Sequence, residues 1–233
     1  EVRAGTIDAG SSLRFRPVTG EDFVPAQSLE LYRSVANNPR TLFERSFDMG
    51  KRPAASLSFA LILVVVFVWQ LSSGGFSLDA LVAQGAKSMA HQRELGEWWR
   101  LITGSLLHAG GLHLTINLMF LLYVGRNIEA ILGPGGLALL IVVSGPGSMA
   151  ISSWATEAAT VGASGVTFGL FGAAVALGWR FDEWLPRSAR AKFGWPMFPF
   201  VVCFLLLGVQ SPGVDNSCHV GGLLLGGALG FVL

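Results

Sequence analysis

The chain has 233 residues and a formal net charge of +1; 13% of its residues are charged and 52% are hydrophobic. Soluble domains average about 25% charged residues, so the composition argues against an ordinary soluble protein. The small net charge gives no reason to expect a nucleic-acid partner, and two cysteines are too few for a disulfide framework.

Residues 1–52 differ from the rest of the chain because they are rich in polar and turn-forming residues and carry charges of both signs. One stretch, residues 29–47, is weakly amphipathic and includes Leu31, Val35, Leu42 and Phe43. We expect residues 1–52 to form a small N-terminal cytoplasmic segment, ordered in part at most, before a membrane domain that covers residues 53–233.

Six windows without Asp, Glu, Lys or Arg follow, at residues 53–78, 101–125, 130–156, 158–179, 193–214 and 216–233. Each is about the length of a helix that crosses roughly 30 Å of hydrocarbon. A long polar segment precedes the first window and no clear cleavage site ends it, so we expect a retained span rather than a signal peptide. A soluble protein with apolar core helices is disfavoured, because six such windows leave almost no polar face for water. The sequence predicts an all-α integral membrane protein with six transmembrane helices.

The basic residues predict the orientation of these spans. One side of the predicted topology carries Arg40, Arg45, Lys51, Arg52, Arg126, Arg180, Arg187, Arg190 and Lys192. The other side has basic residues in one longer loop only, namely Lys87, Arg93 and Arg100. The positive-inside bias therefore predicts that both chain ends are cytoplasmic. We expect the protein to lie in the cell (inner) membrane.

A serine and a histidine stand out in these apolar windows. Ser164 lies near the outer end of the fourth window and His219 near the outer end of the sixth, while His113 and Asn117 lie in the first half of the second. At about 1.5 Å per residue, all four fall within roughly the outer 10–15 Å of the membrane. The sequence therefore predicts that they meet in one layer.

Small residues predict that the fourth and sixth helices approach closely enough for Ser164 and His219 to touch. The sixth window has glycine at every fourth position, at Gly222, Gly226 and Gly230, and His219 lies on the same stripe. The fourth window offers Gly165, Gly169, Gly172 and Ala173. Glycine packing of this kind is common in membrane proteins and does not by itself indicate catalysis.

The chemistry of these residues points to a serine nucleophile. A hydroxyl needs a base within hydrogen-bond reach, and a neutral imidazole is the usual one. His113 and Asn117 project from one helix face and both can donate to an oxyanion, as can backbone N–H groups at a helix N-terminus near Ser164. Taken singly, each residue is more often structural. Asp215 is more often a loop or cap residue, so a Ser164–His219 dyad is the simpler interpretation.

From about Pro53 to its end the chain resembles the rhomboid intramembrane serine proteases. Their pattern is met by Trp99-Arg100, by His113-x3-Asn117, by Glu129 before Leu132-Gly133, by Gly162-Ala163-Ser164-Gly165 and by His219-x2-Gly222-x3-Gly226. The resemblance implies a six-helix rhomboid bundle in which Ser164 is the nucleophile and His219 the base. It also implies that His113, Asn117 and the Ser164 backbone N–H stabilise the oxyanion, and that the fourth helix starts inside the membrane below a water-accessible cavity.

One position departs from this pattern. Several rhomboids have a tyrosine four residues after the catalytic serine, stacked under the histidine, where this chain has Phe168. Phenylalanine keeps the ring and loses the hydroxyl, so we expect the packing of the imidazole to survive. The loop from Gly74 to Arg100 resembles the membrane-embedded first loop of the family, with an ordinary amphipathic surface loop as the alternative.

A peptide bond inside a helix is shielded by its own hydrogen bonds, so substrates are expected to be single-span membrane proteins that unwind near the outer membrane face. Residues 193–214 either form a mobile wall through which such a helix enters from the lipid or simply face the lipid. A transporter is disfavoured, since the inner halves of the windows are almost purely apolar. A rhomboid-like protein that binds transmembrane clients without cleaving them is the main alternative. No metal-binding motif is present, and neither a metal nor a cofactor is expected.

Overall fold

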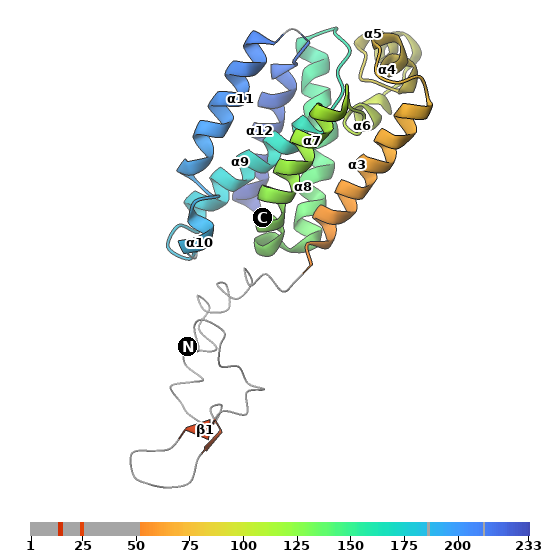
Figure 1. Ribbon diagram of the computed structural model, residues 1–233. Helices are drawn as coiled ribbons and strands as arrows, with labels where there is room; N and C mark the ends of the chain where they lie inside the picture. The colour runs from red at the N-terminus through yellow and green to blue at the C-terminus, as the bar shows by residue number, and fades with distance from the viewer. Residues whose placement is uncertain (1–13, 16–23, 26–51, 186, 212) are drawn as a thin grey trace.

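The structure is a computed structural model that describes residues 14–15, 24–25, 52–185, 187–211 and 213–233 (Figure 1). Near the N-terminus, strand β1 (Arg14–Phe15) pairs antiparallel with strand β2 (Val24–Pro25), with Phe15 opposite Val24. The amphipathic stretch predicted at residues 29–47 lies outside the described residues. Every regular element described from Ala54 onward is a helix, which confirms the all-α prediction for this part of the chain.

The longer helices form the body of the bundle. They are α3 (Ala54–Ser72), α7 (Gly111–Phe120), α8 (Arg126–Ala155), α9 (Ser164–Arg180), α11 (Phe198–Gln210) and α12 (Asn216–Val232). The shorter elements lie between them: α4 (Leu78–Gln84), α5 (Met89–Leu95), α6 (Arg100–Gly104), the π-helical turn η2 (Leu121–Gly125), α10 (Arg187–Arg190) and the 3₁₀ turn η3 (Trp195–Met197). Helices α4 and α5 lie at one end of the bundle, and α10 and the C-terminus lie at the other (Figure 1).

The chain turns back between α7 and the second part of α8 at Gly133. The run from Gly111 to Ala155 is helical throughout except there, where Gly133 has φ 72° and ψ 172°. Glycine adopts a positive φ without steric cost, and the following Pro134 is suited to the first turn of a new helix. The charge-free windows 101–125 and 130–156 place the turn after the second span around Arg126, and this prediction is wrong, because the first helix continues through η2 and carries Arg126 within it.

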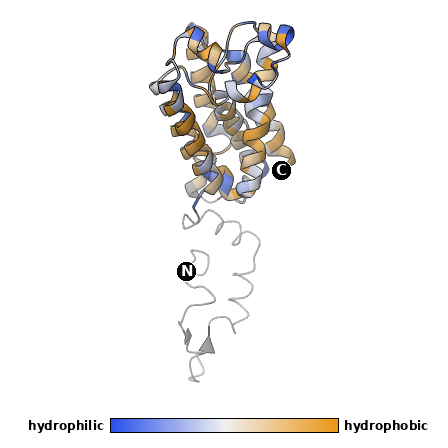
Figure 2. Ribbon diagram, turned by 90° about the vertical axis from the view of Figure 1, so that its right-hand side faces the viewer, coloured by the Kyte–Doolittle hydropathy of each residue, from blue (hydrophilic) through white to orange (hydrophobic). Residues whose placement is uncertain are grey.

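Among the described residues, two helical stretches are long and apolar enough to cross a membrane, α3 and the run Gly111–Ala155, which is itself two helices joined at Gly133. Two shorter apolar helices are Trp195–Gln210 and Asn216–Val232. Hydrophobic residues dominate the middle of the helices and polar residues gather toward the two ends of the bundle (Figure 2). On α3, Leu61 is 64% exposed, as a side chain that faces lipid would be.

Helix α9 lies in the centre of the bundle, and most of its residues are buried. It packs along α12 with the two backbones in contact: a Cβ atom on Gly222 would overlap the carbonyl oxygen of Gly165, and one on Gly226 would overlap that of Gly169. The predicted glycine contact between these helices is confirmed. Helix α9 begins at Ser164 rather than near residue 158, since the preceding residues form a loop tied to Gly104 by the Gly162 N–H.

Candidate active site

Ser164 is the first residue of α9 and is partly buried. The chain reaches it through Gly162, whose φ of +129° is a conformation that side-chain-bearing residues rarely adopt. The ring of His113 occupies the space beside Gly162: a Cβ there would lie 2.7 Å from His113 Nε2. Glycine at position 162 therefore leaves room for the His113 ring against the backbone, two residues before Ser164.

His219 lies in the first turn of α12, 9% exposed, and stacks on Phe168. The ring centroids are 4.2 Å apart and the planes differ by 12°. Phe168 follows Ser164 by four residues on α9, so both lie on the same helix face. The phenylalanine ring packs the imidazole as expected and brings it to the Ser164 end of α9.

In this conformation no hydrogen bond between described residues engages the Ser164 hydroxyl, including one to His219. Catalytic hydrogen bonds often tighten only when substrate is bound, so this geometry is compatible with a nucleophile awaiting its substrate. The residues that follow Ser164 and precede His219 lie close together, since a Cβ on Gly165 would lie 3.3 Å from the sulfur of Cys218.

Asn216 holds the other side of the His219 ring and is a residue that our sequence analysis missed. Its Oδ1 lies 3.1 Å from His219 Nδ1, and its Nδ2 donates to the Leu205 carbonyl of α11 at 3.0 Å. With Nδ1 as the donor, Nε2 of His219 is the nitrogen that can accept a proton. The spacing of three residues before His219 is a signal that could have identified Asn216, because it puts both on one helix face.

Asp215 caps α12 instead of contacting the His219 ring. Its carboxylate accepts from the Cys218 N–H at 3.1 Å, from Thr160 at 2.7 Å, and from Ser152 and Ser217. Burial raises the pKa of Asp215, but these hydrogen bonds outweigh burial and hold it below its ordinary value. The expectation that Asp215 is a cap residue is confirmed.

Two side chains of α7 lie at the start of α9. Asn117 is 3% exposed; its Oδ1 accepts from the Thr167 hydroxyl at 2.9 Å and its Nδ2 donates to the His113 carbonyl at 3.0 Å. His113 Nδ1 accepts from the Ala109 N–H at 3.5 Å, so Nε2 is the nitrogen that carries the proton. The arrangement offers an N–H donor at His113 Nε2, and among the described residues only one N–H of the Asn117 amide has a partner.

His108 is a second residue that sequence reasoning missed. It is fully buried, and its ring lies edge-on to His113 with centroids 5.1 Å apart. Nδ1 lies 3.1 Å from the Leu106 carbonyl, and Nε2 accepts from the Ala163 N–H at 3.5 Å. His108 thereby contacts the turn immediately before Ser164. Its place in a charge-free window, five residues before His113, was the available signal.

Lys87 connects the first loop to the segment that leads to Ser164. Its side chain is fully buried, and Nζ donates to the carbonyls of Thr156 and Ala158, both at 2.9 Å. The backbone of Lys87 also pairs with Thr160. Burial lowers the pKa of Lys87, although the Asp215 charge acts in the opposite direction. This buried lysine fixes the loop between α8 and α9.

Trp99, Arg100 and Glu129 also belong to the predicted pattern, but they do not lie among the side chains around Ser164. Arg100 holds the first loop together by bonds from Nε to Glu97 at 2.6 Å and from Nη1 to the Val82 carbonyl at 2.6 Å, and its guanidinium lies over the Trp99 ring at 4.8 Å. Glu129 accepts at the start of α3 from Ala55 N and from both the N–H and the hydroxyl of Ser56. These residues support the fold rather than the reacting groups.

Within the ranges that the structure describes, no group of three or more His, Cys, Asp or Glu side chains could hold a metal ion. The cluster at the start of α9 instead combines a hydroxyl, a buried imidazole with its Nδ1 engaged, and nearby N–H donors. The fold and this cluster together define the class of the protein: a bundle of apolar, membrane-type helices with a serine and a histidine inside it.

Comparison with known proteins identifies the family within this class. The Rhomboid domain model matches residues 95–233, and the chain belongs to the rhomboid family. It is an integral membrane protein of that family, and the predicted family resemblance is confirmed.

The relatives include proteins named as proteases and proteins named only as rhomboid-like. The chain is 32% identical to rhomboid protease GluP of Bacillus subtilis over 77% of its own length and 34% of that protein. It is 38% identical to RHOMBOID-like protein 4 of Arabidopsis thaliana over 59% of its length and 34% of that protein. It is 28% identical to rhomboid protease GlpG of Pectobacterium atrosepticum over 88% of its length and 78% of that protein. The chain therefore spans about a third of the first two relatives and most of the third.

Proposed function

We propose that this protein is an intramembrane serine endopeptidase that cleaves single-span transmembrane substrates near the outer membrane face. The observation that carries the proposal is the position of His219, which is stacked on Phe168 one turn from Ser164 and bonded to Asn216 through Nδ1. The names of GluP and GlpG support the protease assignment.

In the proposed reaction, Ser164 Oγ attacks the carbonyl carbon of the scissile peptide bond while His219 Nε2 takes the hydroxyl proton. The tetrahedral oxyanion accepts hydrogen bonds from His113 Nε2, Asn117 Nδ2 and the Ser164 backbone N–H. His219 then gives its proton to the departing amine, which leaves an acyl-enzyme on Ser164. Water, deprotonated by His219, hydrolyses that ester and regenerates the serine. The glycines at 162, 165, 222 and 226 permit the close packing that this arrangement needs.

The proposed topology has six transmembrane helices and both ends of residues 53–233 in the cytoplasm. In it, α3, the two helices joined at Gly133, α9, α11 and α12 each cross the membrane, and residues 1–52 form a cytoplasmic segment. Helix α9 is the short span that starts inside the bilayer, because the chain from Thr156 to Ala163 is a loop. The basic residues on the side of α10 support this orientation in the cell membrane.

The test compares the wild type with Ser164→Ala and His219→Ala in proteoliposomes that contain a single-span reporter. Both variants are expected to lose cleavage. Matched controls are Ser211→Ala and His91→Ala, which change a serine and a histidine outside the cluster and should cleave like the wild type. Cleavage by Ser164→Ala at the wild-type rate would show that the mechanism is wrong.

The alternative is a rhomboid-like protein that binds transmembrane clients without cleaving them. A serine-directed fluorophosphonate separates the two, because labelling requires an activated hydroxyl and no substrate. An active protease is labelled in the wild type and loses labelling in both variants. No labelling of a folded wild type, together with retained client binding, would favour the alternative, and labelling of His219→Ala would mean that another group is the base.

A further inference from the structure

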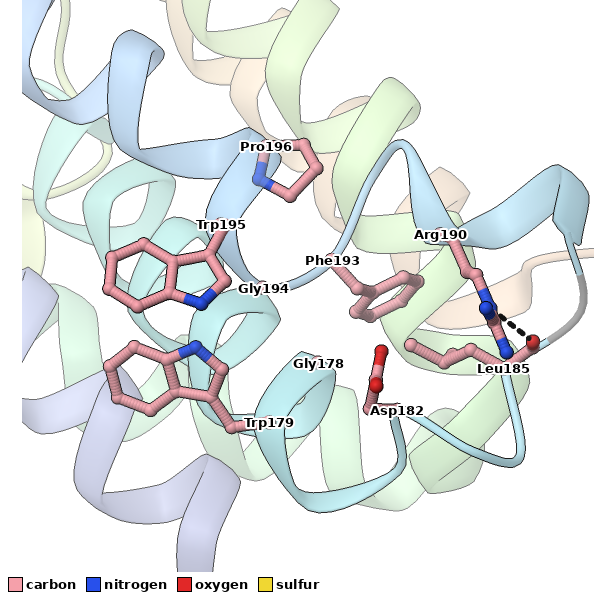
Figure 3. A pocket seen from close by; sticks show the side chains of 9 residues that line it. All are labelled: Gly178, Trp179, Asp182, Leu185, Arg190, Phe193, Gly194, Trp195 and Pro196. Carbon is pink, nitrogen blue, oxygen red and sulfur yellow. Dashed lines mark hydrogen bonds between the residues drawn. The ribbon is translucent and has the colours of Figure 1, made fainter.

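A cavity of about 400 Å³ lies at the end of α9 opposite Ser164 (Figure 3). It is formed by the last turn of α9, the residues around α10 and the turn η3. Its volume falls within the range of about 300–1,000 Å³ that is typical of small-molecule sites. Its lining includes Trp179, Asp182, Leu185, Arg190, Phe193 and Trp195.

The inner wall of this cavity is built from buried side chains and close backbone contacts. Phe193 is 2% exposed and Leu185 is 3% exposed. Behind them the backbone of Gly194 packs on Gly178, where a Cβ would overlap Gly194, and the Gly194 N–H donates to the Ala174 carbonyl at 3.0 Å. The cavity is therefore shaped by backbone contacts and buried apolar side chains rather than by loose surface groups.

Two tryptophans form one side of the cavity, as Figure 3 shows. The rings of Trp179 and Trp195 are 5.6 Å apart, and Trp195 stacks on Phe198 at 4.9 Å. Trp195 is 69% exposed although its neighbours are apolar. Tryptophan is enriched at the membrane–water interface because its ring is apolar and its N–H is polar. The mouth of the cavity is thus suited to the boundary between lipid chains and headgroups.

The remaining lining residues carry one charge of each sign. The Asp182 carboxylate points toward the space below Phe193, and Arg190 comes from the opposite side (Figure 3). Arg190 uses Nε for the Leu185 carbonyl at 3.2 Å. Among the residues that the structure describes, no ion pair engages either side chain. The cavity therefore presents an anion and a cation to the same ligand.

We propose that this cavity binds the headgroup of phosphatidylethanolamine from the surrounding leaflet. The phosphate would lie against the Arg190 guanidinium and the ammonium against the Asp182 carboxylate, while the acyl chains leave past Trp195. Each of these contacts is a charge-assisted hydrogen bond. Phosphatidylglycerol has no amine for Asp182, and the methyl groups of phosphatidylcholine prevent hydrogen bonds to the carboxylate. The proposal does not depend on catalysis at Ser164.

The test measures retained lipid by native mass spectrometry of the purified full chain, equilibrated with equal amounts of the three phospholipids. The wild type is expected to retain phosphatidylethanolamine about tenfold over phosphatidylcholine, as the loss of one charge-assisted hydrogen bond implies. Asp182→Asn should reduce that ratio to about one, and Arg190→Gln should lower the retention of all three. Glu183→Gln and Arg180→Gln are matched controls with the same charge changes beside the cavity, and both should behave like the wild type.

A second measurement uses the fluorescence of the tryptophans beside the cavity. Phosphatidylethanolamine with brominated chains should quench tryptophan fluorescence in the wild type more than brominated phosphatidylcholine does, and Trp195→Phe should remove most of that difference. Circular dichroism checks that each variant is folded, and Asp182→Glu, which keeps the carboxylate, should retain the preference. Equal retention of the three lipids, an unchanged preference in Asp182→Asn, or displacement by inorganic phosphate as effectively as by phosphoethanolamine would overturn the proposal, the last by indicating a site for a free anion.

Discussion

The imidazole of His219 lies flat on the ring of Phe168, with centroids 4.2 Å apart and planes within 12° of parallel. This contact joins α12 to α9 one turn beyond Ser164, and Phe168 itself is only 3% exposed. The ring of His219, the proposed base, is thus held on one face by Phe168 and at Nδ1 by the Asn216 amide.

Replacing Phe168 tests the stacking. Phe168→Leu keeps an apolar side chain of similar size but removes the ring, and we expect kcat to fall up to about tenfold, since aromatic pairs contribute about 0.5–1.5 kcal/mol. Phe168→Tyr should retain activity near that of the wild type. Initial rates of reporter cleavage in proteoliposomes measure both. A Phe168→Leu variant that cleaves at the wild-type rate would contradict a positioning role.

Removing the Asn216 amide tests the orientation of His219. Asn216→Ala is expected to lower kcat about tenfold with KM nearly unchanged, because one hydrogen bond that holds the ring is lost. Asn216→Asp keeps an acceptor for Nδ1 and should retain more activity than the alanine variant. If Asn216→Ala changed only KM, the residue would act on substrate binding and not on the base.

The hydrogen bonds of the Asp215 carboxylate should make the thermal stability of the protein depend on pH. Because the folded-state pKa of Asp215 lies below its ordinary value of 3.8, its hydrogen bonds stabilise the fold fully above that value and are lost as pH falls through the lowered pKa. The wild type should therefore lose thermal stability below about pH 4, and Asp215→Asn should show a weaker dependence there and a lower midpoint at neutral pH. Thr160→Val, which removes one of the bonds, should be intermediate. Parallel pH profiles for the wild type and Asp215→Asn would refute this account.

The contact between α9 and α12 makes different predictions for two adjacent glycines. Gly226→Ala should destabilise the protein by about 1–3 kcal/mol, because the new Cβ overlaps the Gly169 backbone. Gly227 is the matched control: a Cβ added there would lie 3.8 Å from the Gly172 carbonyl oxygen, an ordinary van der Waals contact, so alanine fits. Unfolding in mixed detergent micelles, followed by circular dichroism, compares the two. Equal losses of stability would mean that the helices do not pack through Gly226.

Glu129 should be important for stability and not for chemistry. Its carboxylate accepts three hydrogen bonds at the N-terminus of α3, so Glu129→Ala is expected to cost about 1–3 kcal/mol. Glu157→Ala removes an acidic residue paired with Arg93 at the surface, where the side chains are 86% and 60% exposed, and should be close to wild type. Thermal melts give the stabilities, and fluorophosphonate labelling of the folded fraction should be unchanged in both.

Local patterns in the sequence determined the class of this protein. The apolar composition and charge-free windows indicate membrane helices because hydrophobic length is a property of consecutive residues. The four-residue spacing of Gly222 and Gly226 indicates a close helix contact for the same reason, since it follows from helix periodicity. The motifs around Ser164, His113 and His219 were sufficient to identify the family.

Tertiary structure decided what surrounds those residues. The turn at Gly133, rather than near Arg126, depends on how far α7 continues through η2, and charge alone does not mark that point. The hydrogen bonds of Asn216 and His108 need their partners, Leu205 and Ala163, which other parts of the chain bring near. Hydropathy and spacing describe one helix at a time, whereas a hydrogen bond between distant segments exists only after the helices have packed.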